Sequence, residues 1–309
     1  MAADVCVIFN NRAGRGGAAQ QLRHLQRVLG NRAEFWATQG PAHAADLARQ
    51  AAQAGFHFIG AAGGDGTVHQ VATGILHAGR PEAIMAVFPL GSANDYAHSL
   101  GLEPNWWNRG ENVVQAAAVD VGLVRTSDGR HGYFVNTIGI GFTGSVALDA
   151  EHVPLRGLGR YLIALLHTLC CRFQCPRMAV VFDDRALQEP TLIVSLGIGR
   201  RQGNFVVAPD ALIDDGLFDY LHAGALSRWR LLRLLPAAVQ GRPPTSEPSV
   251  HMGRCRRATV QSDAALVAHI DGEILCRPLQ DVRRLEIEIL PGRLRVLRSR
   301  VEGRGEPRP

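Results

Sequence analysis

The chain has 309 residues, 46% hydrophobic and 20% charged, a composition typical of a globular protein of about two domains and not of a disordered chain. Its formal charge of +5 suits an anionic partner such as an acidic membrane surface, but no nucleic-acid recognition motif accompanies the arginines, so we expect no nucleic-acid ligand. The N-terminus lacks a basic segment followed by a long apolar one, and no apolar run is long enough to span a bilayer, which predicts a cytoplasmic protein whose contact with lipid is peripheral.

The first third of the chain alternates between short apolar runs and helix-like stretches. Strands are predicted at 4–9, 33–37, 56–62 and 83–88, and helices at 18–29, 42–54, 67–78 and 93–100. Regular alternation of this kind predicts a parallel sheet with helices on both faces. We therefore expect an α/β nucleotide-binding domain over residues 1–123, with ligands at the edge where the strands end.

The turn Gly63-Gly64-Asp65-Gly66-Thr67 ends the third predicted strand and opens a helix. Glycines let backbone N–H groups approach a polyphosphate, and a helix N-terminus adds partial positive charge. The Asp65 carboxylate would repel phosphate unless a cation stood between them, so the turn predicts a nucleotide with a divalent metal, most simply Mg-ATP. A tight turn that only packs a helix on a sheet is the alternative. A P-loop is excluded because all 33 basic residues are arginines.

Two other predicted strands end in small polar turns at the same edge of the sheet. The fourth is followed by Pro89-Leu90-Gly91-Ser92-Ala93-Asn94-Asp95, where Ser92 or Asn94 can cap the next helix and Ser92 can donate to phosphate. The first is followed by residues 10–17, where Arg12 offers a forked donor for phosphate oxygens. These turns could face one nucleotide.

The second half of the chain has a different pattern, with short runs typical of antiparallel strands. They are predicted at 119–124, 133–138, 178–182, 191–196, 204–207, 218–222, 258–261, 266–270, 283–289 and 293–298, with two helices at 157–173 and 226–240. This pattern predicts a second, β-rich and sandwich-like domain over residues 124–298.

The second of these helices mixes Arg228, Trp229, Arg230 and Arg233 with leucines, as interfacial helices do. A core-facing amphipathic helix explains the leucines as well, and it is the interpretation favoured here.

Four residues near 170 superficially suggest a metal site: His167, Cys170, Cys171 and Cys175. Only the first three share a helix face, and no second pair of closely spaced cysteines accompanies them. Buried thiols are the favoured interpretation, because cysteine behaves as a small hydrophobic residue.

Five ordered motifs resemble the diacylglycerol kinase catalytic family, most closely its bacterial lipid kinases. They are Asn10-Asn11-Arg12-Ala13-Gly14, the turns at 63–67 and 89–95, the segment 214–219 and Asp271-Gly272-Glu273. The resemblance implies an ATP- and Mg²⁺-dependent kinase that phosphorylates the hydroxyl of diacylglycerol or a related lipid, with the lipid substrate on the second domain. In this family the terminal tail, here residues 299–309, can return to the first domain.

The resemblance also implies which residues contact ATP. They lie on the three turns, on the end of the second strand and on the helix that follows residue 67: Asn10, Asn11, Arg12, Ala13, Gly14, Thr38, Gly63, Gly64, Asp65, Gly66, Thr67, Val68, His69, Gln70, Ser92 and Asn94. For Thr38, a helix cap is the alternative explanation.

Phosphoryl transfer to an alcohol needs charge neutralisation and an acceptor for the hydroxyl proton. The resemblance assigns a catalytic Mg²⁺ to Asp65, directly or through water, with Asp120 as a second acidic member of that network. A strand-end turn explains Asp120 equally well. The proton acceptor is assigned to Glu273, with Asp271 nearby, although Asp271-Gly272 would otherwise be an ordinary hairpin turn.

A second, structural Mg²⁺ is implied at the carbonyls of Leu212 and Leu217 and the carboxylate of Asp215, because hard cations accept such oxygen ligands. A surface β-turn is the alternative here.

The chain also departs from the family pattern. His69 and Gln70 stand where the family usually shows Asn and Glu, and Ser92 replaces Thr with its hydroxyl kept. These departures keep open a catalytically weak nucleotide- or lipid-binding regulator. The glycine turn alone keeps open a soluble NAD kinase-like enzyme, since NAD kinases share it. A homodimer is left open as well.

Overall fold

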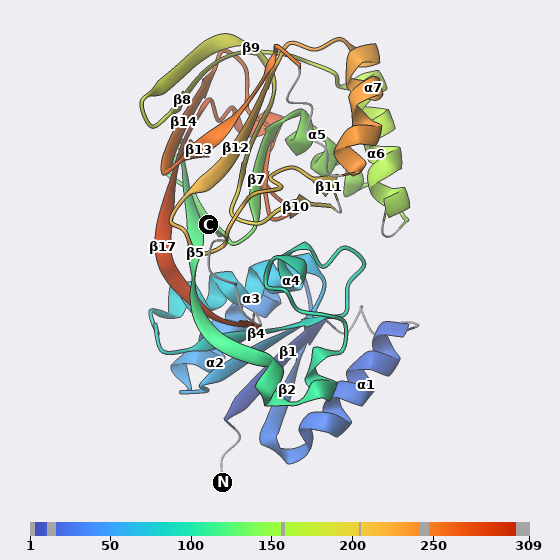
Figure 1. Cartoon of the computed structure of the whole chain (residues 1–309), viewed down its shortest axis with the longest axis vertical. Helices are drawn as coiled ribbons and strands as arrows, with labels where there is room; N and C mark the ends of the chain where they lie inside the picture. The colour runs from blue at the N-terminus through green and yellow to red at the C-terminus, as the bar shows by residue number, and fades with distance from the viewer. Residues whose placement is uncertain (1–3, 11–16, 156–157, 204, 241–246, 301–309) are drawn as a thin grey trace, which may run out of the picture.

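The structure is a computed structural model that describes residues 4–10, 17–155, 158–203, 205–240 and 247–300. Its N-terminal part is built on four parallel strands in the order β2 (Ala33–Thr38), β1 (Val5–Asn10), β3 (Phe58–Gly63) and β4 (Ile84–Pro89). Around this sheet lie α1 (Gly17–Leu29), α2 (His43–Gln53), α3 (Asp65–Ala78) and α4 (Asp95–Ser99), with short 3₁₀ turns at Gly30–Arg32, Trp106–Arg109 and Glu111–Val113 (Figure 1). The predicted parallel α/β domain is confirmed.

Helix α3 begins at Asp65, two residues earlier than predicted, because the glycine turn itself forms its first turn. The amides of Thr67 and Val68 both donate to the carbonyl of Gly64. The turn that would approach a ligand is therefore also the helix N-terminus.

The C-terminal part is an antiparallel β-rich domain with two layers. One layer contains β16 (Glu273–Cys276), β15 (Ala268–Ile270), β7 (Thr137–Gly141), β9 (Arg185–Gly197), β12 (Phe218–Gly224) and β13 (Val250–Cys255). The other contains β8 (Arg177–Phe182), β14 (Arg257–Ser262), β17 (Arg284–Ser299), β5 (Val114–Thr126) and β6 (His131–Phe134). Strand β9 joins the layers, since it pairs with β8 along its first half and with β7 and β12 along its second. The predicted β-rich domain is confirmed.

Two long strands, β5 and β17, run through both domains. β17 pairs with β5 along almost its whole length, with β14 at its start and with β4 near its end. We predicted two strands, at 283–289 and 293–298, but the structure has one with a bulge. Gly292 adopts φ +60° and donates its amide to Asp120, which lets the strand continue past Pro291. Of the predicted tail, 299–309, the structure describes Ser299 and Arg300, whose amides donate to the carbonyls of Leu100 and Val113. The rest of the tail lies outside the described residues.

Three helices and a small hairpin cover the second domain: α5 (Phe142–Ala150), α6 (Leu158–Cys171), α7 (Arg228–Val239), β10 (Arg201–Gln202) and β11 (Phe205–Val206), with a 3₁₀ turn at Pro278–Gln280. Helix α5 was not predicted, because Gly144, Ser145 and Val146 are weak helix formers and tertiary packing decides its conformation.

The cysteines of α6 are more exposed than predicted. Cys6, Cys255 and Cys276 are buried, but Cys170 and Cys171 lie on the exposed side of α6, so the prediction of buried thiols is wrong for these two. The helix covers the domain with one face only, and the periodicity of the sequence did not identify that face.

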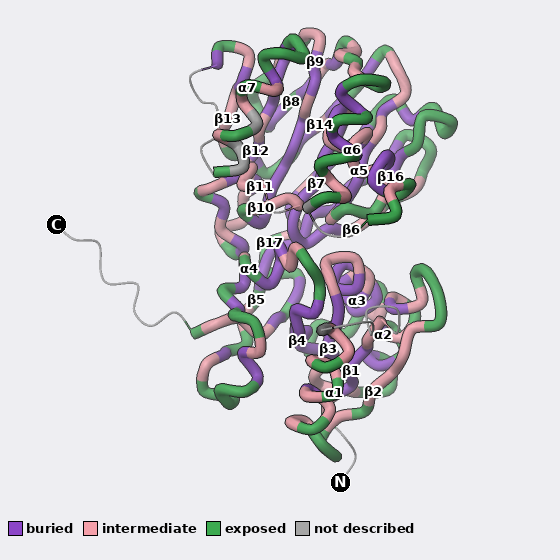
Figure 2. Tube along the Cα trace, turned by 90° about the vertical axis from the view of Figure 1, so that its right-hand side faces the viewer, coloured by how far each residue is buried: buried purple, intermediate pink, exposed green. Residues whose placement is uncertain are grey.

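The buried apolar side chains form a core that continues from the parallel sheet into the β-rich domain. Figure 2 shows buried residues, in purple, along the strands of both parts and exposed residues, in green, in the surrounding loops. A smaller cluster lies under α5, α6 and α7. No helix in the described part of the chain combines the length and hydrophobicity needed to cross a bilayer.

Gly74 in α3 lies against the backbone of α2, where a Cβ would collide with the carbonyl oxygen of Ala45. We expect Gly74→Ala to lower the free energy of unfolding by about 1–3 kcal/mol, because overpacking outweighs the better helix propensity of alanine. Gly159→Ala in α6 is the matched control, since a Cβ there would come no closer than 3.9 Å to a neighbour. It should leave stability unchanged or raise it by up to about 1 kcal/mol. Urea unfolding measures both, and equal effects would contradict the packing explanation.

Candidate functional site

A pocket of about 300 Å³ with mostly polar walls lies where the parallel strands end, and we call it the polar pocket. Its walls come from the ends of β1 and β2, from α2, from the first two turns of α3 and from the start of β16: Asn10, Thr38, Gln39, Gly40, Pro41, Ala44, Gly64, Gly66, Thr67, Gln70 and Glu273. Six of the predicted ATP contacts therefore lie together: Asn10, Thr38, Gly64, Gly66, Thr67 and Gln70. The predicted contacts Asn11, Arg12, Ala13 and Gly14 lie outside the described residues.

The two glycine turns pack against each other, backbone to backbone. Leu90 donates its amide to the carbonyl of Gly63, and a Cβ on Gly91 would collide with the Cα of Gly64. Asn94, in the left-handed region at φ +53°, closes its own turn by accepting from the amide of Gly91 and donating to its carbonyl. Ser92 is exposed on this turn, beside the glycines. Close approach of the two strand ends thus explains Gly91 without any ligand.

Asp65 lies at the N-terminus of α3 and is held by the second turn. Its carboxylate accepts backbone N–H groups from Asn94 at 2.9 Å and from Tyr96 at 3.4 Å. Burial raises the pKa of Asp65 to about 6, and the negative charge of Asp95 adds to this effect. Because ionisation of this carboxylate is unfavourable in the isolated protein, a nearby cation would stabilise its charged form.

The sequence did not identify Asp95 as a site residue, although it directly follows Asn94 in a motif that we singled out. Its side chain is 5% exposed, accepts the amide of Gly203 from the second domain at 2.5 Å and lies close enough to Asp65 to perturb its pKa. An Asp at the first position of a helix is common as a dipole partner, so its sequence position carried no signal.

Asp271 joins the two domains at this site. Its carboxylate accepts the backbone N–H groups of Val135, Asn136 and Thr137, each at 2.9 Å, and lies 2.9 Å from Nδ1 of His69 in α3. The residue adopts φ +50°, a conformation that Asp tolerates in tight turns. With four partners, the carboxylate is fixed in place and holds the turn 271–273 against α3.

His69 is buried in this contact. Burial by itself lowers the pKa of His69, but the hydrogen bond to Asp271 and the charges of Asp271 and Glu273 outweigh it, so the pKa is raised. The residue that departs from the family pattern is therefore the partner of Asp271 across the domain interface.

Glu273 reaches the glycine turn from the second domain. Its carboxylate oxygen lies 2.8 Å from the point that a Cβ on Gly66 would occupy, so a side chain at position 66 would displace the end of the Glu273 side chain. The side chain of Asp271 is only 3% exposed, whereas Glu273 is exposed at the wall of the polar pocket. Glu273 therefore faces the polar pocket, whereas the Asp271 carboxylate is occupied by its four partners.

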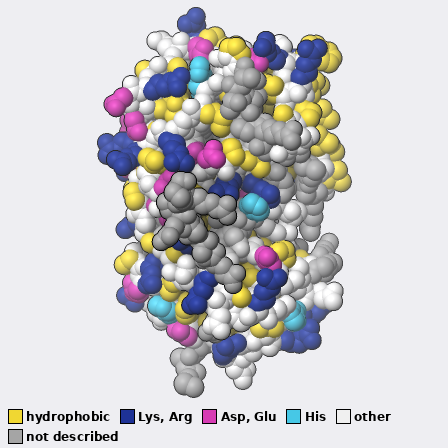
Figure 3. All heavy atoms as spheres, viewed as in Figure 1, with side chains coloured by type: hydrophobic (Ala, Val, Ile, Leu, Met, Phe, Trp, Pro, Cys, Tyr) yellow, Lys and Arg dark blue, Asp and Glu magenta, His cyan; other side chains and the backbone are white. Residues whose placement is uncertain are grey.

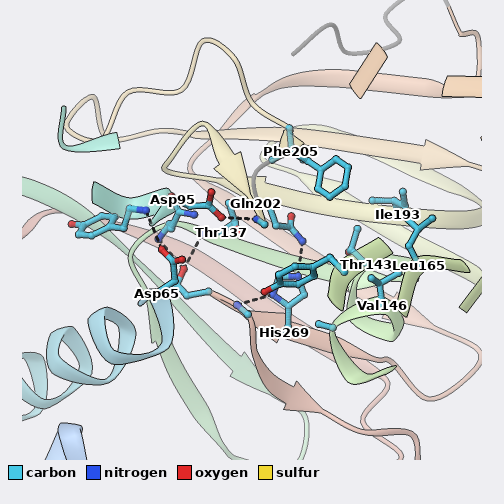
Figure 4. A pocket seen from close by; sticks show the side chains of 18 of the residues that line it. Asp65, Asp95, Thr137, Thr143, Val146, Leu165, Ile193, Gln202, Phe205 and His269 are labelled. Atoms are coloured by element: carbon cyan, nitrogen blue, oxygen red, sulfur yellow. Dashed lines mark hydrogen bonds between the residues drawn. The ribbon is translucent and has the colours of Figure 1, made fainter. Parts of the chain in front are cut away.

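A second cavity, of about 190 Å³, lies on the other side of the turn 271–273, and we call it the apolar cavity. Figure 4 shows Asp65 and Asp95 at one end of it and Val146, Leu165 and Ile193 at the other. Its remaining walls include Val68 of α3 and residues of the second domain, among them Tyr161, Phe205, Leu231, His269 and Asp271. His269 is fully enclosed, so burial lowers its pKa to about 4 and the ring is neutral.

Gly63 was predicted as an ATP contact, but the packing of α3 already explains why this residue is glycine. A Cβ on Gly63 would collide with the Thr67 side chain, so glycine is needed there for the first turn of the helix.

Asp120 and the segment 212–217 form a separate group. Asp120 is buried and accepts the amides of Gly216 at 2.7 Å and Gly292 at 2.8 Å. Burial raises the pKa of Asp120, and the charges of Asp215 and Asp214 contribute to the rise. Among the described residues, the hydrogen bonds of Asp120 reach this segment and the bulge of β17, and none reaches Asp65.

Asp215 carries an unsatisfied oxygen. Its Oδ1 accepts the amide of Leu217 at 3.1 Å, while its buried Oδ2 has no hydrogen-bond partner among the described residues and lies 3.6 Å from the Arg254 guanidinium. A buried carboxylate oxygen without a donor fits a cation ligand.

Comparison with known proteins agrees with these features. A family model described as the diacylglycerol kinase catalytic domain matches residues 4–126, and one described as the YegS C-terminal NAD kinase beta sandwich-like domain matches residues 136–298. A "Probable lipid kinase YegS-like" of Chromohalobacter salexigens is 29% identical over 276 residues, which cover 87% of this chain and 86% of that protein. A "Diacylglycerol kinase" of Bacillus subtilis is 25% identical and covers 86% of this chain and 88% of its own length.

The fold is shared with solved structures as well. A diacylglycerol kinase from Bacillus anthracis str. Sterne superposes with a TM-score of 0.68 at 18% identity, over 96% of this chain and 97% of that one. Both halves of the chain match family models in the same order, and the relatives are covered along most of their length. The chain therefore belongs to the diacylglycerol kinase family, with a diacylglycerol kinase catalytic domain followed by a YegS-type C-terminal domain.

Proposed function

We propose that the protein is an ATP- and Mg²⁺-dependent kinase that phosphorylates the hydroxyl of diacylglycerol or a related lipid. The observation that carries this proposal is that the polar pocket and the apolar cavity meet at two short segments. The first turn of α3 and the turn 271–273 contribute residues to both. A phosphate donor on one side and an apolar acceptor on the other would bring their reacting atoms together there.

In this proposal, residues 1–123 bind the nucleotide and residues 124–298 bind the lipid. The amides of the glycine turn and the N-terminus of α3 face the phosphates, with Thr38 and Gln70 on the walls of the polar pocket. Asp65 is half-buried and Asp95 is buried, and their charges disfavour each other, so the two carboxylates are a donor set that fits a hard cation. When bound, Mg²⁺ would neutralise charge on the transferred phosphoryl group.

Glu273 is the proposed proton acceptor. The lipid hydroxyl oxygen forms a bond to the γ-phosphorus while the bond from that phosphorus to the oxygen bridging to the β-phosphate breaks, leaving ADP. The hydroxyl proton passes to the Glu273 carboxylate, which stands at the wall of the polar pocket beside Gly66. Asp271 holds the turn in place through its four contacts and acts as a positioning residue.

The contact between His69 and Asp271 supports an active kinase over the regulator alternative. His69, at a position where the family usually has another residue, contacts Asp271 directly. It therefore supports the turn 271–273 instead of leaving it without a partner on α3. The structural cation proposed for Leu212, Asp215 and Leu217 would use the unsatisfied Oδ2 of Asp215 and stiffen the loop against β5, where Asp120 already fixes Gly216.

We also propose that the protein works in the cytoplasm with α6 and α7 against the membrane. These helices line the apolar cavity through Leu165 and Leu231, and they carry exposed apolar side chains outward: Leu162, Ile163, Leu166 and Trp229. In Figure 3, hydrophobic side chains lie along the upper right edge, where Figure 1 places these helices. A lipid could pass from the bilayer into a cavity that the same helices enclose.

Incubation with labelled ATP, Mg²⁺ and a panel of acceptors tests the proposed function. Diacylglycerol, sphingosine and phosphatidylglycerol are presented in mixed micelles, with NAD as the soluble acceptor. We expect label in an organic-phase product, because the cavity beside the glycine turn is apolar. Label in an aqueous dinucleotide would favour an NAD kinase, and ATP binding with no product would favour the regulator.

Glu273→Gln should lower kcat in this assay by about 10²–10⁴-fold, the usual contribution of a general base, while Mg-ADP binding stays within a few-fold of the original. Glu286→Gln, which changes an exposed side chain on β17, is the matched control and should keep full activity. Full turnover by a folded Glu273→Gln protein would refute the assignment.

The raised pKa of Asp65 predicts acid sensitivity of cation binding. Because a proton competes with Mg²⁺ for a carboxylate of pKa about 6, affinity for Mg²⁺ in the presence of ADP should fall about tenfold per pH unit below 6 and level off above it. Calorimetric titrations between pH 5 and 8 measure this. The ADP phosphates titrate in a similar range, so the difference between the wild-type and Asp65→Asn profiles isolates Asp65, and parallel profiles would contradict its role.

The membrane-facing helices predict a loss of vesicle binding. Trp229→Ala combined with Leu162→Ala should weaken co-sedimentation with vesicles containing anionic lipid by about tenfold or more, since each side chain contributes about 1.5–3 kcal/mol on burial. Activity on a short-chain, soluble diacylglycerol should not change. Leu279→Ala removes a fully exposed leucine from the 3₁₀ turn at 278–280 and is the control. An equal loss of vesicle binding in the control would indicate nonspecific hydrophobic binding and contradict a role for these two helices.

A further inference from the structure

Three side chains that commonly bind metals lie together in the β-rich domain, and they line neither the polar pocket nor the apolar cavity. Glu189 of β9, His222 of β12 and His251 of β13 come from three neighbouring antiparallel strands of the upper domain in Figure 1. Their ligand atoms all lie within 4.8 Å of one another. His222 and His251 are direct cross-strand partners, and their rings stack with centroids 5.9 Å apart.

The hydrogen bonds around His222 determine which of its nitrogens carries the proton. Thr191 Oγ1 lies 3.1 Å from the carbonyl of Glu189 and 3.1 Å from His222 Nε2. When its only proton is donated to the carbonyl, the oxygen accepts from Nε2. In this arrangement Nε2 carries the hydrogen and Nδ1 presents a lone pair.

That lone pair faces a carboxylate. His222 Nδ1 lies 3.7 Å from Glu189 Oε1, too far for a hydrogen bond, and both atoms are buried without a hydrogen-bond partner among the described residues. An imidazole lone pair and a carboxylate oxygen that face each other with no donor between them suit the binding of a cation.

We propose that Glu189, His222 and His251 form a binding site for a transition-metal ion of the Zn²⁺ class. Ligands about 2.1 Å from a tetrahedral ion are about 3.4 Å apart, so the 3.7 Å between Nδ1 and Oε1 needs only a small contraction. Two imidazoles and one carboxylate suit such an ion, whereas Mg²⁺ and Ca²⁺ prefer oxygen ligands alone. Water completes the coordination.

The surrounding backbone leaves room for this arrangement. A Cβ on Gly224 would lie 3.2 Å from Glu189 Oε1, so glycine at this strand end allows the carboxylate to lie over β12. The strands meet here at an irregular register, with a shift between Ala223 and Gly224. An ion bound to all three strands would fasten this irregular end of the layer, independently of the kinase reaction.

A titration of the metal-stripped full-length protein with Zn²⁺, in excess Mg²⁺ so that hard-cation sites are occupied, tests the proposal. We expect one tight equivalent by competition with a chromogenic chelator, a visible tetrahedral absorption band when Co²⁺ is used instead, and a higher melting temperature with Zn²⁺. His251→Gln and Glu189→Gln should each weaken this equivalent by at least about tenfold and abolish the thermal shift. These two are chosen because His222 is fully buried and its replacement risks unfolding the protein.

Two controls exclude binding elsewhere. His131→Gln alters an exposed histidine whose ring lies 6.2 Å from that of His77, and Cys170→Ser with Cys171→Ser removes the exposed thiols of α6. Both should keep the tight equivalent. Its absence from the wild type, its persistence in both His251→Gln and Glu189→Gln, or its loss in the cysteine variant would overturn the proposal.

Discussion

The pairing of β5 with β17 is the constraint on which the rest of this structure depends. Each strand belongs to both domains, and their ladder extends from Leu285 opposite Thr126 to Ser299 opposite Val114. The two domains are therefore joined by backbone hydrogen bonds along a continuous ribbon instead of by a flexible linker. β17 also pairs with β4, the strand that precedes the second glycine turn. A tilt of one domain against the other has to bend this ribbon. The sheet therefore sets the distance between the glycine turn of the first domain and the turn 271–273 of the second.

Side chains between the two domains add further contacts to those of the β5–β17 ribbon. The Asp271 carboxylate accepts hydrogen bonds from three backbone amides of its own domain and contacts His69 of the other domain. A neutral side chain at position 271 would leave buried donors unpaired, which is costly. Asp95 makes the reverse connection, from α4 to the amide of Gly203. Two carboxylates thus cross the interface in opposite directions and fix the approach of Glu273 to the glycine turn.

Local patterns predicted the fold class and most of the elements, because strand and helix periodicities are local properties. The turns at 63–67 and 89–95 were recognised for the same reason: their glycines and polar residues are contiguous. Helix α5 was missed because its residues have no strong preference of their own. The unbroken course of β17 was missed because Pro291 and Gly292 usually end a strand, and only the distant Asp120 explains the bulge.

The candidate site was predicted less completely than the fold, since its decisive contacts join residues far apart in sequence. The importance of His69 depends on Asp271, 202 residues away, and that of Asp95 depends on its closeness to Asp65 and on Gly203. Asp120 was expected in the network of Asp65, but its hydrogen bonds place it with the segment 212–217. A local motif can therefore indicate that a residue belongs to a site, but it does not show which distant residue that residue contacts.

The electrostatics of Asp65 explain why such a site would favour a cation over remaining empty. Its folded-state pKa of about 6 lies above the ordinary 3.8, so the folded protein holds the proton more tightly than the unfolded chain does. The stability that this group contributes is present below the ordinary pKa and is lost as the pH rises through 6. At neutral pH, the isolated protein therefore carries an ionised carboxylate whose burial and whose neighbour Asp95 both oppose the charge. A divalent cation reverses both effects at once, because it replaces the lost solvation of Asp65 and attracts the two carboxylates that repel each other.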